Sequence, residues 1–143
     1  MSEVRALNVL LIEDDDVAAE AVTRGLRRHA AEIQVTPAED GAVALQILRG
    51  QHPTRRVAAP RLVLLDLNMP RMNGFEFLRE LRSDPQLRCT VVFVLTTSDI
   101  ETDRTRAYAE CIAGYIVKSR LGPQCSGLAR FLTEYREVVL LPG

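Results

Sequence analysis

Five short apolar runs alternate along the chain with longer segments whose apolar positions recur at helical spacing. Each run is four to six residues long, the size of a buried strand rather than a helix. The runs are Asn8–Ile12, Ile33–Thr36, Arg61–Leu65, Thr90–Leu95 and Gly114–Val117. Strands that are apolar on both faces belong to a sheet covered on both sides, so we expect a parallel sheet.

The segments between and after these runs predict five helices. They cover Asp16–His29, a helix capped by Asp40 that reaches Leu48, Gly74–Arg82, a helix capped by Ser98 or Asp99 that reaches about Ile112, and Pro123–Val138. Short polar residues that precede an apolar periodic segment are typical N-caps. Strands that alternate with helices indicate the α/β class.

The composition fits one globular domain. The chain has 143 residues and a net charge of -1, with 47% hydrophobic and 26% charged residues. These values exclude general disorder and argue against binding nucleic acid through bulk charge. We expect a single domain over residues 1–143, with Gly50–Pro60 as an insertion inside it.

Location is predicted from what the sequence lacks. No apolar run approaches the roughly 20 residues of a membrane span, and no signal peptide is recognised at the N-terminus. Cys89, Cys111 and Cys125 are widely spaced and show no metal-binding pattern. We expect reduced thiols and a cytoplasmic protein that binds neither membranes nor nucleic acid.

Polar residues follow four of the five predicted strands. Glu13–Asp16 follows the first strand, Asp66 the third, Thr96–Ser98 the fourth and Lys118 the fifth. In an open parallel sheet, ligands bind outside the carboxyl ends of the strands. If the strand order is 2-1-3-4-5, the acids of the first and third strands lie at the switch point, where the connections diverge to opposite faces.

Several carboxylates in one cleft repel one another and need a neutralising partner. A hard divalent cation such as Mg²⁺ suits them, with Asp14 and Asp66 as the expected donors and Glu13 acting through water. Lys118 offers positive charge and Thr96 a hydrogen bond to a phosphoryl group. A carboxylate beside a metal, facing such groups, is the arrangement for an aspartyl-phosphate.

Four motifs, each at a predicted strand end and in this order, closely resemble those of response-regulator receiver domains. They are Leu10–Asp15, Leu64–Gly74, Val94–Ser98 and Gly114–Lys118. The resemblance spans about residues 7–138 and implies a flavodoxin-like, doubly wound, five-stranded parallel sheet in the order 2-1-3-4-5 with five helices.

The resemblance also implies the role of each site residue. Asp66 would accept a phosphoryl group from a sensor histidine kinase in a Mg²⁺-dependent reaction, and the backbone carbonyl of Asn68 would complete the metal ligands. Thr96 and Lys118 would hold the phosphoryl oxygens, and Tyr115 would be the aromatic switch residue. Such a domain is not an enzyme acting on a separate substrate, although it catalyses its own phosphorylation and dephosphorylation.

The chain is further similar to the short regulators paired with bacterial phytochrome kinases. Gly50–Pro60, Thr96–Ser98, Ala109–Tyr115 and the ending after Tyr135 carry this likeness. Only residues 139–143 follow the last helix, so we expect a single-domain regulator. The four apolar residues at this end should not remain in water; they either fold back or form a homodimer arm, and they are Val138, Val139, Leu140 and Leu141.

The sequence departs from the family at one position and leaves other functions open. Ser119 follows Lys118 where receivers usually have a proline after a cis peptide, so this bond is either trans or strained cis. Ser98 and Asn68 stand where receivers tune attack by water. An aspartate-nucleophile phosphatase would need an acid at position 68, and flavin binding would need a hydroxyl- and glycine-rich loop after the first strand. A phosphorylation-independent scaffold remains an alternative.

Overall fold

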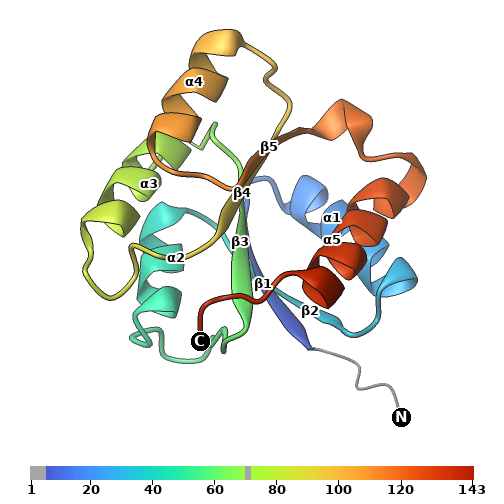
Figure 1. Ribbon diagram of the computed structural model, residues 1–143, viewed down its shortest axis with the longest axis horizontal. Helices are drawn as coiled ribbons and strands as arrows, with labels where there is room; N and C mark the ends of the chain where they lie inside the picture. The colour runs from blue at the N-terminus through green and yellow to red at the C-terminus, as the bar shows by residue number, and fades with distance from the viewer. Residues whose placement is uncertain (1–5, 70–71) are drawn as a thin grey trace.

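The computed structural model describes residues 6–69 and 72–143 (Figure 1). Residues 70 and 71, which belong to the second family motif, lie outside the described part. Five parallel strands form one sheet in the order β2-β1-β3-β4-β5, so the predicted topology is confirmed. The strands are β1 (Leu7–Ile12), β2 (Ile33–Ala38), β3 (Arg61–Leu65), β4 (Val92–Thr96) and β5 (Gly114–Val117).

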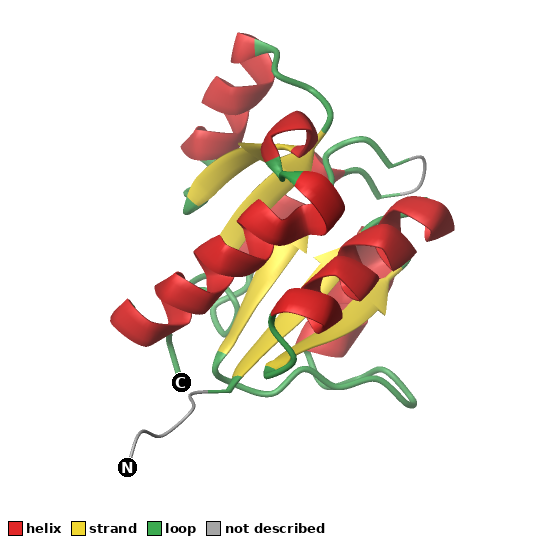
Figure 2. Ribbon diagram, turned by 90° about the vertical axis from the view of Figure 1, so that its right-hand side faces the viewer, coloured by secondary structure: helices red, strands yellow, loops and turns green. Residues whose placement is uncertain are grey.

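Helices cover both faces of the sheet, which explains why β1, β3 and β4 are buried along nearly their whole length. Helices α1 (Asp16–His29) and α5 (Ser126–Val138) lie on one face (Figures 1 and 2). The opposite face carries α2 (Gly41–Leu48), α3 (Gly74–Ser83) and α4 (Glu101–Ala109). Alternate residues of β1 enter the two cores in turn: Leu7, Val9 and Leu11 face α1 and α5, whereas Leu10 and Ile12 face the other layer.

Local side-chain chemistry begins three of the helices. The side chain of Asp15 accepts hydrogen bonds from the backbone N–H groups of the first turn of α1. Asp40 caps α2 as predicted, and Asn73 caps α3. Each cap satisfies amide donors that have no partner inside the helix, a contribution of about 1 kcal/mol.

Helix α4 differs from its prediction at both ends. It runs over Glu101–Ala109, and its N-cap is Ile100, which has no side-chain capping bond. The hydroxyl of Ser98 donates to Asp103 at 2.9 Å and accepts the Ile100 N–H at 3.3 Å. The predicted cap residue is therefore held in the loop before the helix, and α4 starts later than its sequence indicates.

The last predicted helix is divided. A 3-10 turn, η2 (Pro123–Cys125), precedes α5, and both Gln124 and Cys125 have left-handed backbone angles. A Cβ atom on Gly25 of α1 would lie 2.5 Å from the Gln124 carbonyl oxygen. This close approach of α1 places the turn where the apolar spacing alone predicts helix.

Some of the C-terminal residues pack on the fold, and others are exposed to solvent. Helix α5 ends at Val138, and Leu141 packs partly against the core beneath α1 and α5. Val138 and Leu140 are 79% and 81% exposed. None of the helices within the described residues is both long and apolar enough to cross a membrane.

Candidate functional site

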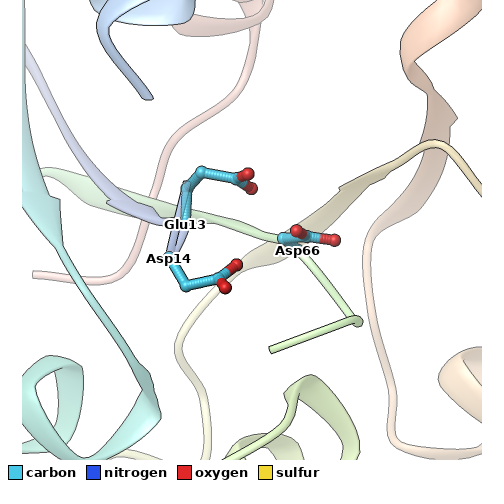
Figure 3. A group of neighbouring side chains, drawn as sticks. All are labelled: Glu13, Asp14 and Asp66. Atoms are coloured by element: carbon cyan, nitrogen blue, oxygen red, sulfur yellow. The ribbon is translucent and has the colours of Figure 1, made fainter. Parts of the chain in front are cut away.

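Three carboxylates meet at the carboxyl ends of β1 and β3. Glu13 and Asp14 follow β1, and Asp66 follows β3, whose Leu65 pairs with Ile12 in the parallel ladder. One oxygen from each side chain lies within 4.8 Å of those of the other two. Figure 3 shows Glu13 and Asp14 projecting from the end of β1 beside Asp66. The structure therefore brings together the acids that the sequence singles out.

Burial makes this cluster costly to leave fully ionised. Glu13 and Asp66 are 7% and 8% exposed, whereas Asp14 is open to solvent. Burial raises the pKa of Glu13 to about 7, reinforced by its hydrogen bond and repulsion with Asp66 and opposed by Lys118. A buried acid whose pKa is raised beside a second carboxylate marks a place where a cation would be favoured.

The donor set fits a hard divalent cation. All three groups are carboxylates, the ligand type that Mg²⁺ and Mn²⁺ prefer, and one of them is reachable from solvent. Asn68 lies at the rim, and its N–H donates to Asp66 Oδ1 at 3.2 Å. This bond folds the chain after Asp66 back toward its carboxylate.

A glycine that sequence reasoning did not single out determines the position of the Asp66 backbone. A Cβ atom on Gly74 would lie 2.7 Å from Leu67 Cα and 2.8 Å from the Asp66 carbonyl oxygen. The first turn of α3 therefore packs directly on the chain that carries Asp66. In the sequence, the signal for this close packing is a glycine at the start of the helix that follows the acid, because glycine has no side chain to prevent it.

Lys118 reaches the cluster from η1 (Lys118–Arg120), the 3-10 turn directly after β5. Its Nζ lies 3.3 Å from Glu13 Oε2, in a pair that is largely shielded from solvent. The Lys118–Ser119 peptide is trans, because the one cis bond found in residues 6–69 and 72–143 is Ala59–Pro60. The amine is therefore placed at the acids without the cis proline that the family usually has.

Thr96 and Tyr115 meet at Ser98 rather than at the carboxylates. Thr96 is fully buried, and its Oγ1 accepts the Ser98 N–H at 3.3 Å. The Tyr115 hydroxyl donates to the Ser98 carbonyl at 3.0 Å, and burial raises the pKa of this phenol. Asp103, which sequence reasoning missed, holds the Ser98 hydroxyl. An acid in the first turn of a helix is ordinary, so the sequence offers no distinct signal for it.

The sequence matches the profile of the response regulator receiver domain over residues 9–122. Among curated proteins, it is 33% identical to the response regulator Rcp1 of Synechocystis sp. over 139 residues, which cover 94% of this chain and 92% of Rcp1.

Solved structures show the same likeness over the whole fold. The phosphorylated cyanobacterial phytochrome response regulator RcpA is 29% identical with a TM-score of 0.81, covering 97% of this chain and 100% of RcpA. The Mn²⁺-bound form of Rcp1 is 31% identical with a TM-score of 0.78, covering 95% of this chain and 99% of Rcp1.

Proposed function

Since this chain belongs to the response regulator receiver domain family, we propose that it is a phosphorylation switch whose Asp66 accepts a phosphoryl group from a sensor histidine kinase. The observation that carries the proposal is the carboxylate cluster of Glu13, Asp14 and Asp66 at the switch point of the sheet. An oxygen of Asp66 attacks the phosphorus, the bond to the phosphohistidine nitrogen breaks, and the imidazole leaves.

Mg²⁺ would be held by the carboxylates of Asp14 and Asp66, by Glu13 through water, and by the backbone carbonyl of Asn68. When bound, it would offset the repulsion between an arriving phosphoryl group and the acids. The mixed burial of the three acids supports this assignment, since two are enclosed and one faces solvent. A relative, Rcp1, has been solved in a Mn²⁺-bound form, which supports a divalent cation in this chain.

One amine, of Lys118, and one hydroxyl, of Thr96, would then hold the phosphoryl oxygens. Lys118 already lies at the cluster, paired with Glu13. Thr96 is buried and bound by Ser98, so its hydroxyl would turn toward the phosphoryl group after transfer. Tyr115 would leave the Ser98 carbonyl and move inward behind Thr96. The new charge would thus select between two arrangements of the β4–α4 loop.

We assign the kinase partner to the phytochrome class and the site of action to the cytoplasm. The likeness to RcpA, a phytochrome response regulator, covers 97% of this chain. The carboxylate cluster at the carboxyl end of the sheet is open to a partner through Asp14. A single receiver domain over residues 1–143 would pass its signal through protein contacts.

The C-terminal segment would join two copies of the chain. Val139, Leu140 and Leu141 border a groove of about 290 Å³ that Ala6, Leu7, Pro60 and Arg136 complete. Because Val138 and Leu140 are exposed in the single chain, their apolar surface is free to be covered by a second copy. A symmetric exchange of such arms is a low-cost route to a homodimer.

Intact-protein mass after incubation with acetyl phosphate and Mg²⁺ tests the proposal. The parent protein should gain about 80 Da, and Asp66→Asn should not. Glu134→Gln, which alters an exposed acid on α5, is the matched control and should gain the same mass. No gain in the parent, with Mg²⁺ binding intact, would favour a phosphorylation-independent scaffold. Multiple turnovers on small phosphate esters would favour an aspartate-nucleophile phosphatase.

A further inference from the structure

The guanidinium of Arg82 joins two segments at the amino-terminal edge of the sheet. Its Nη1 donates to the carbonyls of Arg88 and Thr90, both at 2.8 Å. Its Nε donates to the carbonyl of Glu110 at 2.7 Å, and its Nη2 to that of Cys111 at 3.0 Å. One rigid planar group therefore fixes the turn before β4 against the turn before β5.

Two cysteines lie in these two turns. Cys89 stands between the two carbonyls that Arg82 Nη1 holds, and Cys111 supplies one of the carbonyls on the other side. Both cysteines are exposed and carry free thiols. The strands that follow them, β4 and β5, begin side by side, because the Ala113 N–H donates to the Val92 carbonyl at 2.7 Å.

The two cysteines also interact electrostatically with the same group, the guanidinium of Arg82. Burial lowers the pKa of Arg82, and the charges of Cys111 and Cys89, in that order, oppose this effect. Both thiols are thus close enough to one guanidinium to interact with it. The thiolate is the form of a cysteine that reacts with oxidants. In addition, Cys111 has a left-handed backbone angle, φ 60.

We propose that Cys89 and Cys111 form a dithiol site that closes to an intramolecular disulfide under hydroperoxides, with Arg82 holding the two turns in place. One thiolate attacks the peroxide, the O–O bond breaks, and a sulfenic acid and one molecule of water or alcohol form. The second thiol displaces the sulfenic hydroxyl as water, and the S–S bond closes. Each sulfur loses one electron, and the peroxide accepts both.

The proposed site lies apart from the carboxylate cluster. Cys89 and Cys111 precede β4 and β5, whereas the acids follow β1 and β3 at the opposite edge of the sheet. The bond would enclose β4 and α4 in a covalent loop of about 20 residues, which restricts the unfolded chain and stabilises the fold. This inference therefore stands or falls independently of phosphorylation at Asp66.

Thiol counting on the full chain after treatment with hydrogen peroxide tests the proposal. The reduced protein should take up N-ethylmaleimide at all three cysteines, and the oxidised protein only at Cys125. Cys125 is the internal control, because it is half-buried and burial raises the pKa of its thiol. Peptide mapping should show a linked Cys89–Cys111 pair, and the oxidised protein should melt several degrees higher than the reduced one.

Four variants distinguish this pair from unselective oxidation. Cys125→Ser should form the same linked pair, whereas Cys89→Ser and Cys111→Ser should form none. Arg82→Lys keeps the positive charge but loses the planar fork, so its disulfide should form several-fold more slowly. Bonds between chains, a linked pair that includes Cys125, or sulfinic acid at Cys89 and Cys111 in place of the bond would overturn the proposal.

Discussion

The Nζ atom of Lys118 lies 3.3 Å from Oε2 of Glu13, although 105 positions separate the two residues in the sequence. The amine reaches the acids from the turn after β5, and the trans peptide to Ser119 permits this approach. The pair leaves one positive charge beside three carboxylates. This relationship links the protonation of the cluster to the group proposed to bind phosphate.

Removal of the Lys118 amine should abolish most phosphoryl transfer. In Lys118→Ala, no fixed cation would stabilise the charge that develops on the phosphoryl oxygens, and the loss of one such group commonly lowers a rate by about 100- to 1,000-fold. The measurement is the rate of mass gain with acetyl phosphate and Mg²⁺. Arg120→Ala, which removes an exposed charge two residues later, should change the rate less than about twofold. A Lys118→Ala rate equal to the parent's would contradict the assigned role.

The stability of the metal-free protein should fall as the pH rises toward neutrality. The pKa of Glu13 is raised from 4.5 to about 7, so the folded protein keeps a proton that the unfolded chain releases within this window. The free energy of unfolding should therefore decrease between about pH 4.5 and 7 and level off above it. Thermal unfolding in EDTA measures this effect, and Glu13→Gln should remove this part of the pH dependence.

Mg²⁺ should bind more tightly as the pH rises, and its binding should offset the fall in stability of the metal-free protein. Binding to the ionised acids must displace the proton on Glu13, so the apparent Mg²⁺ affinity should rise with pH up to about 7 and then become constant. Titration calorimetry in two buffers of different ionisation enthalpy should detect the released proton. An affinity that does not vary between about pH 6 and 8 would place the metal away from Glu13.

Gly74→Ala should destabilise the fold and impair the site together. The added methyl group would lie 2.7 Å from Leu67 Cα and 2.8 Å from the Asp66 carbonyl oxygen, both backbone atoms that cannot turn aside. We expect a loss of about 1–3 kcal/mol in the free energy of unfolding and slower phosphorylation. Gly50→Ala is the control, because its φ of +71 disfavours alanine but no atom lies within 4 Å. It should cost about 1 kcal/mol and leave phosphorylation unchanged.

The sequence predicts the sheet well because its apolar strands and polar strand ends are local signals. Asp66 and Asp14 are found from the same signals, since a parallel sheet brings its carboxyl ends together. The start of α4 is missed because Ser98 bonds to Tyr115 and Thr96, contacts that the helix pattern does not contain. Likewise, the turn at Gln124 depends on the approach of Gly25, which apolar spacing cannot reveal.

Tyr115→Phe should favour the inward position of the ring. The variant loses the hydrogen bond from the hydroxyl to the Ser98 carbonyl, which is worth about 0.5–1.5 kcal/mol. The ring populations should then change by about two- to tenfold, which NMR of selectively labelled aromatic residues can measure. Tyr108→Phe, at an exposed position on α4, is the matched control. An unchanged ring population in Tyr115→Phe would show that this bond does not hold the switch residue.

Substitution of Val138 and Leu140 separates an arm that joins two chains from one that serves its own fold. Both side chains are largely exposed in the single chain, so their replacement by serine should not lower its intrinsic stability. If the arm covers a second copy, Val138→Ser/Leu140→Ser should be monomeric by light scattering at concentrations where the parent is dimeric. Leu141→Ser is the contrasting variant, because Leu141 packs against its own core and its loss should lower the melting temperature. A dimer that persists in the double variant would assign the interface to another surface.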